Sequence, residues 1–200
     1  MKKWISLFAA VSLLLAALLI LPIHGEAGIY DQVIRLHVLA ASDSEEDQAR
    51  KLLVRDAILQ ECEHILANVS EKEEAKARLE AAIPQLEAAG ERALREVNCG
   101  DSVCAVLCEE HYPRRSYESV ALPAGEYLSL QVRVGEGQGQ NWWCVLFPPM
   151  CLSAATAERE TACLAAGLSE EQYRMITDTD KTKYRLRFKI LEVAEEWLGS

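Results

Sequence analysis

The residues best suited to chemistry in this chain are a polar pair near its start and a segment rich in glycine and tryptophan further on. Arg35 and His37 interrupt the apolar run 33–40, and Cys144 follows two adjacent tryptophans within the segment 135–151. A cysteine thiolate activated by a neighbouring imidazole is the arrangement that cysteine hydrolases use. One hypothesis is therefore a small cysteine-dependent hydrolase or thiol-redox enzyme with Cys144 as nucleophile and His37 as base.

Several features of the sequence argue against catalysis. No motif places an asparagine or aspartate to orient His37, and Cys144 lies in an apolar run, where thiols are usually inert. The chain has no serine-centred elbow and no His-Glu-x-x-His pair. Cys99, Cys104 and Cys108 lack the two-residue spacing of zinc knuckles. We therefore predict that the protein is not an enzyme, holds no metal and needs no cofactor.

The alternating glycines before the tryptophans do not form a nucleotide-binding loop. Gly135, Gly137 and Gly139 lack the spacing of a dinucleotide-binding motif and the Lys-Ser/Thr of a P-loop, and Glu136 would repel phosphate. We expect these glycines to permit positive φ angles and close approach of the backbone instead.

The two adjacent tryptophans predict a binding surface. Neighbouring residues of a strand point to opposite faces, so one of Trp142 and Trp143 should reach the core and the other should face outward or cover a groove. The alternative is that both are packed. An outward tryptophan beside a permissive loop is a common binding anchor. The predicted binding residues are Gly135, Gly137, Gly139, Asn141, Trp142 and Trp143.

Arg35 and His37 are expected to hold the strand next to this surface. Buried charges need partners, so the default interpretation is a structural pair bonded to Asp43 or Asp56.

The cysteines permit disulfides in an exported protein. Cys144 and Cys151 flank a Pro-Pro pair that can turn the chain back on itself, so we predict that they form a bridge. The chain has seven cysteines, and an odd number leaves at least one free thiol or an intermolecular bond. No pairing is predicted for Cys62, Cys99, Cys104, Cys108 and Cys163.

The N-terminus is typical of an export signal. Two lysines precede the uncharged run 4–21, and the small residues Gly25 and Ala27 suit a cut after Ala27. Residues 1–27 are therefore a signal peptide or, if uncleaved, a membrane anchor, since the run is near the minimum length for a span. In either case residues 28–200 form the domain that works outside the cytoplasm.

The charge excludes two classes of partner. The chain carries a net charge of −10. Removing residues 1–27 takes away two lysines and one glutamate, which leaves 19 basic and 30 acidic residues and a net charge of −11. This argues against binding nucleic acid and against electrostatic binding to anionic lipid. The sequence identifies no small-molecule substrate.

The periodicity predicts an α+β fold with a single domain, an antiparallel sheet with helices packed on it. The first strand is 33–40, and Ser42 or Ser44 caps the helix that follows, to about residue 67. A second helix opens at Ser70 and should be kinked or divided by Pro84.

The later part of the chain changes to strands and then to helices. The predicted strands are 103–112, 116–122, 127–134 and 142–147, arranged as an antiparallel meander whose last two strands the glycine-rich loop joins. The predicted helices are 154–166 and 182–198, with a strand at 184–190 as the alternative to the start of the last one.

The segment 135–151 resembles a signature of the stage II sporulation protein R family. The run 34–40, the polar residues 42–48, the segment 51–56 and Leu122-Pro-Ala-Gly-Glu-Tyr127 match as well, in the expected order. The resemblance covers most of the chain from about residue 33 to residue 151.

This resemblance implies a role in endospore formation. A member of this family is a signalling protein, secreted across the forespore membrane into the space between the two sporulation membranes. There it activates a membrane-bound aspartic protease of the mother cell, which processes a sigma-factor precursor. We therefore expect an exported ligand of that protease.

Overall fold

The structure is a computed structural model that describes residues 28–117, 120–150 and 156–177. Its centre is a four-stranded sheet in the order β2-β5-β1-β6. Its strands are β1 (Ile34–Leu39), β2 (Val103–Tyr112), β5 (Gly125–Val134) and β6 (Asn141–Phe147). A small second sheet joins β3 (Arg115–Ser116) to β4 (Ala121–Leu122). The helices are α3 (Glu45–Ile65), α4 (Lys72–Glu96), α5 (Thr156–Ala165) and α6 (Glu170–Thr177).

The helices and the sheet confirm the predicted α+β class with a single domain, but the strand order differs from a meander. Strand β1 lies between β5 and β6, parallel to β5 and antiparallel to β6. The sheet is therefore mixed, and the glycine-rich loop joins two strands that are not neighbours. The reason is that β1 is buried along nearly its whole length, as is typical of a strand inside a sheet.

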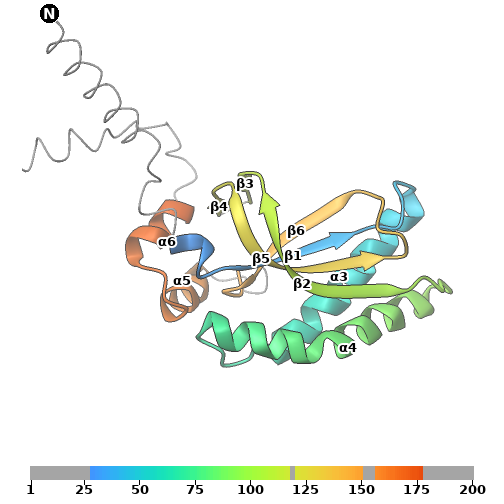
Figure 1. Cartoon of the computed structure of the whole chain (residues 1–200), viewed down its shortest axis with the longest axis horizontal. Coiled ribbons are helices and arrows are strands. Elements are labelled where there is room, and N and C mark those ends of the chain that lie inside the picture. Colours follow the sequence, from blue (N-terminus) through green and yellow to red (C-terminus); the bar gives the residue numbers. More distant parts are fainter. Residues whose placement is uncertain (1–27, 118–119, 151–155, 178–200) are drawn as a thin grey trace, which may run out of the picture.

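The two long helices cover one face of this sheet, with α3 and α4 packed against each other (Figure 1). Helix α3 begins as predicted, because the backbone N–H of Asp47 donates to the Ser44 side chain at 3.1 Å. Helix α4 begins at Lys72, after a Glu71 cap without a side-chain bond, so Ser70 does not cap it. Pro84 lies inside α4 and does not divide it.

The main core lies between these helices and the sheet. Alternate residues of each strand point to it, as predicted for the apolar residues of β5. Its sheet side is formed by Leu36, Val38, Leu130, Val132, Cys144 and Leu146, and its helix side by Val54, Ile58, Leu79, Leu86 and Leu94.

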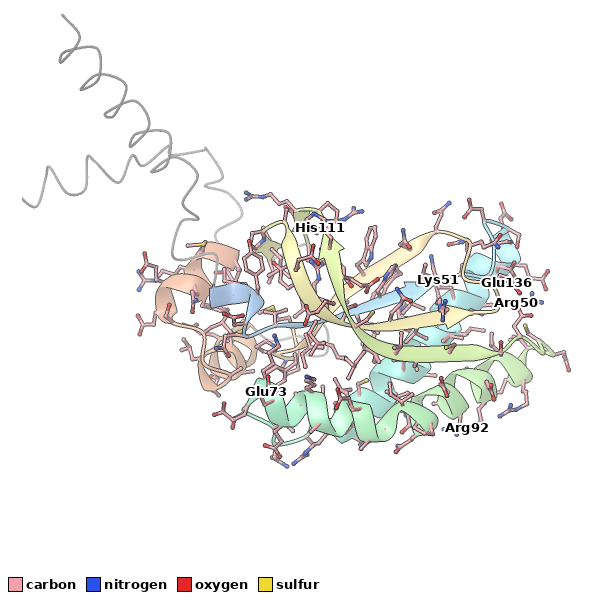
Figure 2. All side chains as sticks on the ribbon, viewed as in Figure 1. Arg50, Lys51, Glu73, Arg92, His111 and Glu136 are labelled. Atoms are coloured by element: carbon pink, nitrogen blue, oxygen red, sulfur yellow. The ribbon has the colours of Figure 1, made fainter. Side chains whose placement is uncertain are left out.

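A second, smaller core lies at the end of the sheet where α5, α6, β3 and β4 gather (Figure 1). Tyr112, Tyr127 and Val145 from the sheet meet Cys163 and Ile176 there. Figure 2 shows His111 toward this end, whereas Lys51 and Glu136 lie at the opposite end, beside the glycine-rich loop.

Some predicted elements fall elsewhere or outside the described residues. The predicted strand 116–122 is the β3–β4 pair, and the helix predicted at 154–166 is α5, followed by Gly167 with a φ of +91°. The predicted segments 1–27 and 182–198 lie outside the described residues. In the part of the chain that is described, no helix has the length and apolar character needed to cross a membrane.

Candidate binding site on the far face of the sheet

Arg35 and His37 point to the far face, which we define as the face of the four-stranded sheet opposite α3 and α4. Their neighbour Leu36 points to the main core, because side chains alternate along a strand. In the register of β1 with β6, His37 lies beside Trp143 and Leu36 lies beside Cys144. Trp143 therefore shares the far face with His37, whereas Cys144 points to the helices.

This register excludes the catalytic pair of the hydrolase hypothesis. Cys144 is buried in the main core with 7% of its surface exposed, on the opposite face from His37. A base must reach its nucleophile within hydrogen-bond distance. Cys144 and His37 therefore do not form a nucleophile and base.

His37 is the centre of a polar network on the far face. Its Nδ1 lies 2.9 Å from Oε1 of Glu110, and its Nε2 lies 2.8 Å from Oδ1 of Asn141. Gln131 donates to the same Glu110 oxygen at 2.7 Å. Two oxygen acceptors at the two ring nitrogens suit an imidazolium, whereas a neutral ring needs the Asn141 amide turned to donate.

Glu110 is held as a carboxylate by this network. Burial raises the pKa of Glu110. Hydrogen bonds from His37, Ser129 and Gln131, together with the charge of His37, lower it by more than burial raises it, so the pKa falls to about 2. Its side chain is 17% exposed. The far face therefore carries a fixed, largely buried negative charge beside His37.

Arg35 lies among aromatic rings instead of beside a carboxylate. Its guanidinium carbon is 3.9 Å from the ring centroid of Tyr112 and 5.1 Å from that of Tyr127, and its Nη2 donates to the Tyr117 hydroxyl. The Arg35 side chain is completely buried. The interpretation of Arg35 and His37 as partners of Asp43 or Asp56 is therefore wrong, because strands distant in sequence supply the partners; Asp56 pairs with Arg55.

The two tryptophans point to opposite faces, as predicted, and both are partly buried. Trp142 packs against the main core, with the guanidinium of Arg55 5.0 Å from its ring centroid. Trp143 lies on the far face, 5.6 Å from the His37 ring and 4.1 Å from the guanidinium of Arg115. Of the pair, Trp143 belongs to the site.

The three glycines of the loop have structural roles of the kind predicted. Gly135 and Gly137 have φ angles of +54° and +64°, which favour glycine. A Cβ on Gly139 would lie 2.2 Å from the backbone oxygen of Ser42, so only glycine fits there. The backbone N–H of Gly139 donates to the carbonyl of Ala40 at 2.8 Å.

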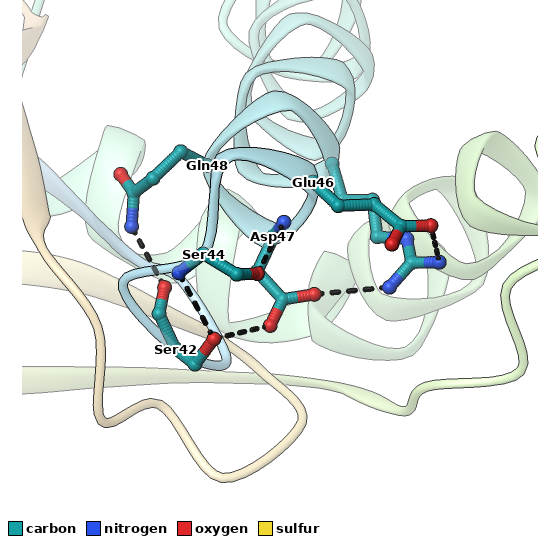
Figure 3. A network of polar contacts seen from close by, with 6 residues as sticks. Ser42, Ser44, Glu46, Asp47 and Gln48 are labelled. Carbon is teal, nitrogen blue, oxygen red and sulfur yellow. Dashed lines mark hydrogen bonds and ion pairs between the residues drawn. The ribbon is translucent and has the colours of Figure 1, made fainter.

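Residues 42–51 hold the glycine-rich loop from the other side. We call the contact between residues 40–51 and residues 135–140 the joint. Ser42 donates to Asp47 at 2.6 Å, and Gln48 donates to the Ser42 carbonyl at 2.8 Å. Figure 3 shows both contacts. The buried Lys51 bonds the Gln48 side chain at 2.6 Å and the Gln140 carbonyl at 3.0 Å. The joint thus fixes the chain just before Asn141. Contact between the glycine-rich loop and a receptor stays a prediction.

The cysteines add no site. Cys62, Cys99, Cys104 and Cys108 are free thiols among the described residues. Cys151 lies outside the described residues, so its bridge to Cys144 stays a prediction. Within the described ranges, no group of three or more histidines, cysteines and acidic residues could hold a metal ion.

The structure therefore brings together only part of the predicted set. Arg35, His37, Asn141 and Trp143 meet on the far face, Trp142 lies on the other face, and the glycines lie in the joint at one end. The sequence reasoning missed partners from β2, β3, β5 and the residue after β3, namely Glu110, Tyr112, Arg115, Tyr117, Ser129 and Gln131. The sequence carries a signal for Glu110 as a residue of this face, because Glu110 continues the alternation of outward-facing residues along β2.

The fold and this site define a small α+β domain with a polar and aromatic sheet face. The sequence model of "Stage II sporulation protein R (spore_II_R)" matches residues 30–157, which include every residue of the far-face site. The chain belongs to this family. Stage II sporulation protein R of Bacillus subtilis (strain 168) is 36% identical over 123 residues, which cover 62% of this chain and 55% of that relative. The match thus spans about half the length of the relative. No solved structure matches.

Proposed function

We propose that this protein is an exported signal of endospore formation that activates a membrane-bound aspartic protease of the mother cell. The protease then processes a sigma-factor precursor. The observation that carries the proposal is the family match over residues 30–157. The separation of Cys144 and His37 on opposite faces of the sheet supports a ligand over a cysteine hydrolase.

The far face is the surface that we assign to the receptor. Trp143 is partly buried on the edge strand β6, flanked by His37 and Arg115. A tryptophan beside an arginine is a common anchor of protein interfaces, where truncation costs about 2 kcal/mol or more. Contact with the receptor would use the side chains of the far face. The joint, which includes the glycine-rich loop, fixes the position of these side chains.

Co-expression tests the proposal. The full-length chain, the protease and its precursor are produced together in a host without other sporulation proteins, and processing is followed by immunoblot. We expect cleavage only when all three are present. The proposal is wrong if the secreted, folded chain leaves the precursor intact.

A pair of variants tests the assigned surface. Trp143→Ala should abolish processing while the variant is still secreted and folded, with a thermal midpoint lowered only by the loss of its packing against the second core. Leu53→Ala, which truncates a 40%-exposed residue of α3, is the matched control and should still trigger cleavage. Normal processing by folded Trp143→Ala would remove the far face from the contact.

Export supplies two further tests. We propose that the protein is secreted into the space between the sporulation membranes, and mass spectrometry of the exported form should give an N-terminus near Gly28. An intact Met1 in the membrane fraction would replace secretion with anchoring. Peptide mapping without reduction should recover a Cys144–Cys151 bridge, and alkylation of both thiols would refute it.

A further inference from the structure

The arginines of this protein are paired unevenly. Every arginine of α3, α4 and α6 has a carboxylate oxygen 2.5 to 3.5 Å from its guanidinium. On the sheet side of the described chain, four arginines have no such partner: Arg35, Arg114, Arg115 and Arg133. In a chain with a net charge of −10, unpaired arginines on one side are unexpected.

Two of these four arginines lie against aromatic side chains of the far face. Arg35 donates to the hydroxyl of Tyr117, and Arg115 lies two residues before Tyr117 with its guanidinium 4.1 Å from the ring centroid of Trp143. Burial raises the pKa of Tyr117, and the charges of both Arg35 and Arg115 oppose that rise, as expected when both lie near the hydroxyl. Arg35 and Arg115 thus lie on either side of the Tyr117 segment, Arg35 through its hydrogen bond to the Tyr117 hydroxyl and Arg115 through its position two residues earlier, against Trp143.

Arg35 has donors that nothing in the described chain satisfies. Its Nε and Nη1 are buried without a hydrogen-bond partner. A guanidinium keeps its charge at physiological pH, and a buried charge is costly unless it is paired. The tyrosine rings attract the cation but offer these N–H groups no acceptor in the plane of the guanidinium.

The nearby carboxylate is already occupied. Oε1 of Glu110 takes His37 and Gln131, and its Oε2 lies 3.3 Å from the hydroxyl of Tyr112. No ion pair joins Glu110 to Arg35. An acceptor for Arg35 must therefore come from outside the described residues.

We infer that Arg35 and Arg115 form a binding site for a carboxylate supplied by a partner protein, an inference that rests on the proposed function for the existence of that partner. Guanidinium and carboxylate groups match in charge and planar geometry. Trp143 offers an apolar surface to the chain that carries the carboxylate. Tyr117 is only partly buried, so displacement of its ring opens the route to Arg35.

A singly charged carboxylate suits this site better than a phosphate group. The strongly acidic chain repels a phosphate dianion and an anionic lipid surface at long range. The donors without partners are also few and lie at the bottom of an aromatic cluster, where a flat group fits more closely than a tetrahedral one. The occupant is therefore an aspartate or glutamate side chain, or a C-terminal carboxylate.

Titration of the isolated protein with sodium acetate tests the site without the partner. The readout is the nuclear magnetic resonance signal of the Arg35 Nε–H, with sodium chloride at equal ionic strength as the control. We expect a saturable shift with a dissociation constant on the order of millimolar, typical of a single small anion. The absence of saturation, or an equal response to chloride, overturns the inference.

A matched pair of charge reversals tests the site in the co-expression assay. Arg115→Glu should lower processing at least about tenfold, which corresponds to about 1.4 kcal/mol of binding. Arg114→Glu makes the same charge change at the preceding exposed residue, which stacks on no ring of the described residues, and should process normally. Equal processing by both variants overturns the inference and leaves the proposed function intact, whereas failure of the parent chain refutes the function itself.

Arg35→Met separates binding from folding. Arg35 has no ion pair among the described residues, so an apolar replacement of similar length should leave the protein folded: it loses the contacts with Tyr112 and Tyr117 but also removes a buried charge without a paired carboxylate. The acetate response, read for this variant at the Trp143 indole N–H, should disappear together with processing. An Arg35→Met protein that folds and still triggers cleavage would show that Arg35 serves only the fold.

Discussion

Glu110 should make this domain sensitive to acid over a narrow range of pH. Its pKa is lowered from an ordinary 4.5 to about 2, with 17% of the side chain exposed. At about 1.4 kcal/mol for each tenfold change in acid dissociation, this lowering corresponds to about 3 kcal/mol of stability. A carboxyl with a depressed pKa stabilises the fold fully above its unfolded pKa. We therefore expect this contribution at neutral pH and its loss as the pH falls from about 4.5 to about 2.

Glu110→Gln measures this contribution, since the amide keeps the shape and loses the charge. Urea unfolding at a series of pH values should give a difference between parent and variant of about 3 kcal/mol near pH 6, closing toward zero near pH 2. Glu109→Gln, an exposed neighbour on the other side of β2, is the control and should follow the parent curve. A difference that is independent of pH would refute the assignment of Glu110 as a stabilising carboxylate.

Three further outcomes follow from the packing. Gly139→Ala should lower the free energy of unfolding by about 1–3 kcal/mol, because the new methyl group meets a backbone oxygen. The control Gly100→Ala, whose new methyl group has nothing within 4 Å, should change it by less than about 0.5 kcal/mol. Equal thermal midpoints of the two variants would contradict this prediction. Trp142→Ala should cost about 2–4 kcal/mol in denaturant unfolding, somewhat less than a fully buried tryptophan, and a loss below about 1 kcal/mol would remove it from the core. In the native protein the exposed Cys104 should react with iodoacetamide well before Cys62, because burial raises the pKa of the Cys62 thiol to about 12. Equal labelling of the two cysteines in mass spectrometry would argue against this packing.

The local elements could be predicted from the sequence because their signals are local. The buried run 33–40 and the alternation of 127–134 appear as β1 and β5, and Ser44 caps α3 three residues before Asp47. Each of these patterns depends on residues only a few positions apart. Their physical causes, side-chain alternation and capping, act within one strand or one helical turn.

The site could be predicted only in part because its partners are distant in the chain. His37 and Glu110 are 73 residues apart, and His37 and Asn141 are 104 residues apart. They meet because β1 enters the sheet between β5 and β6, an order that no local pattern specifies. Asp43 and Asp56 were expected as partners because they are near in sequence, although α3 carries Asp56 to the other side of the sheet.

The position of β1 also controls when this chain can fold. The first strand to be synthesised is an inner strand, and Ile34 has no sheet partner until Leu128 and Phe147 exist. At about 5–20 residues per second, synthesis of the intervening chain takes about 5–20 seconds. During that time the four-stranded sheet cannot form, although α3 and α4 are already complete. This delay agrees with the export that we propose, because a chain without its sheet can still cross a membrane and fold on the far side.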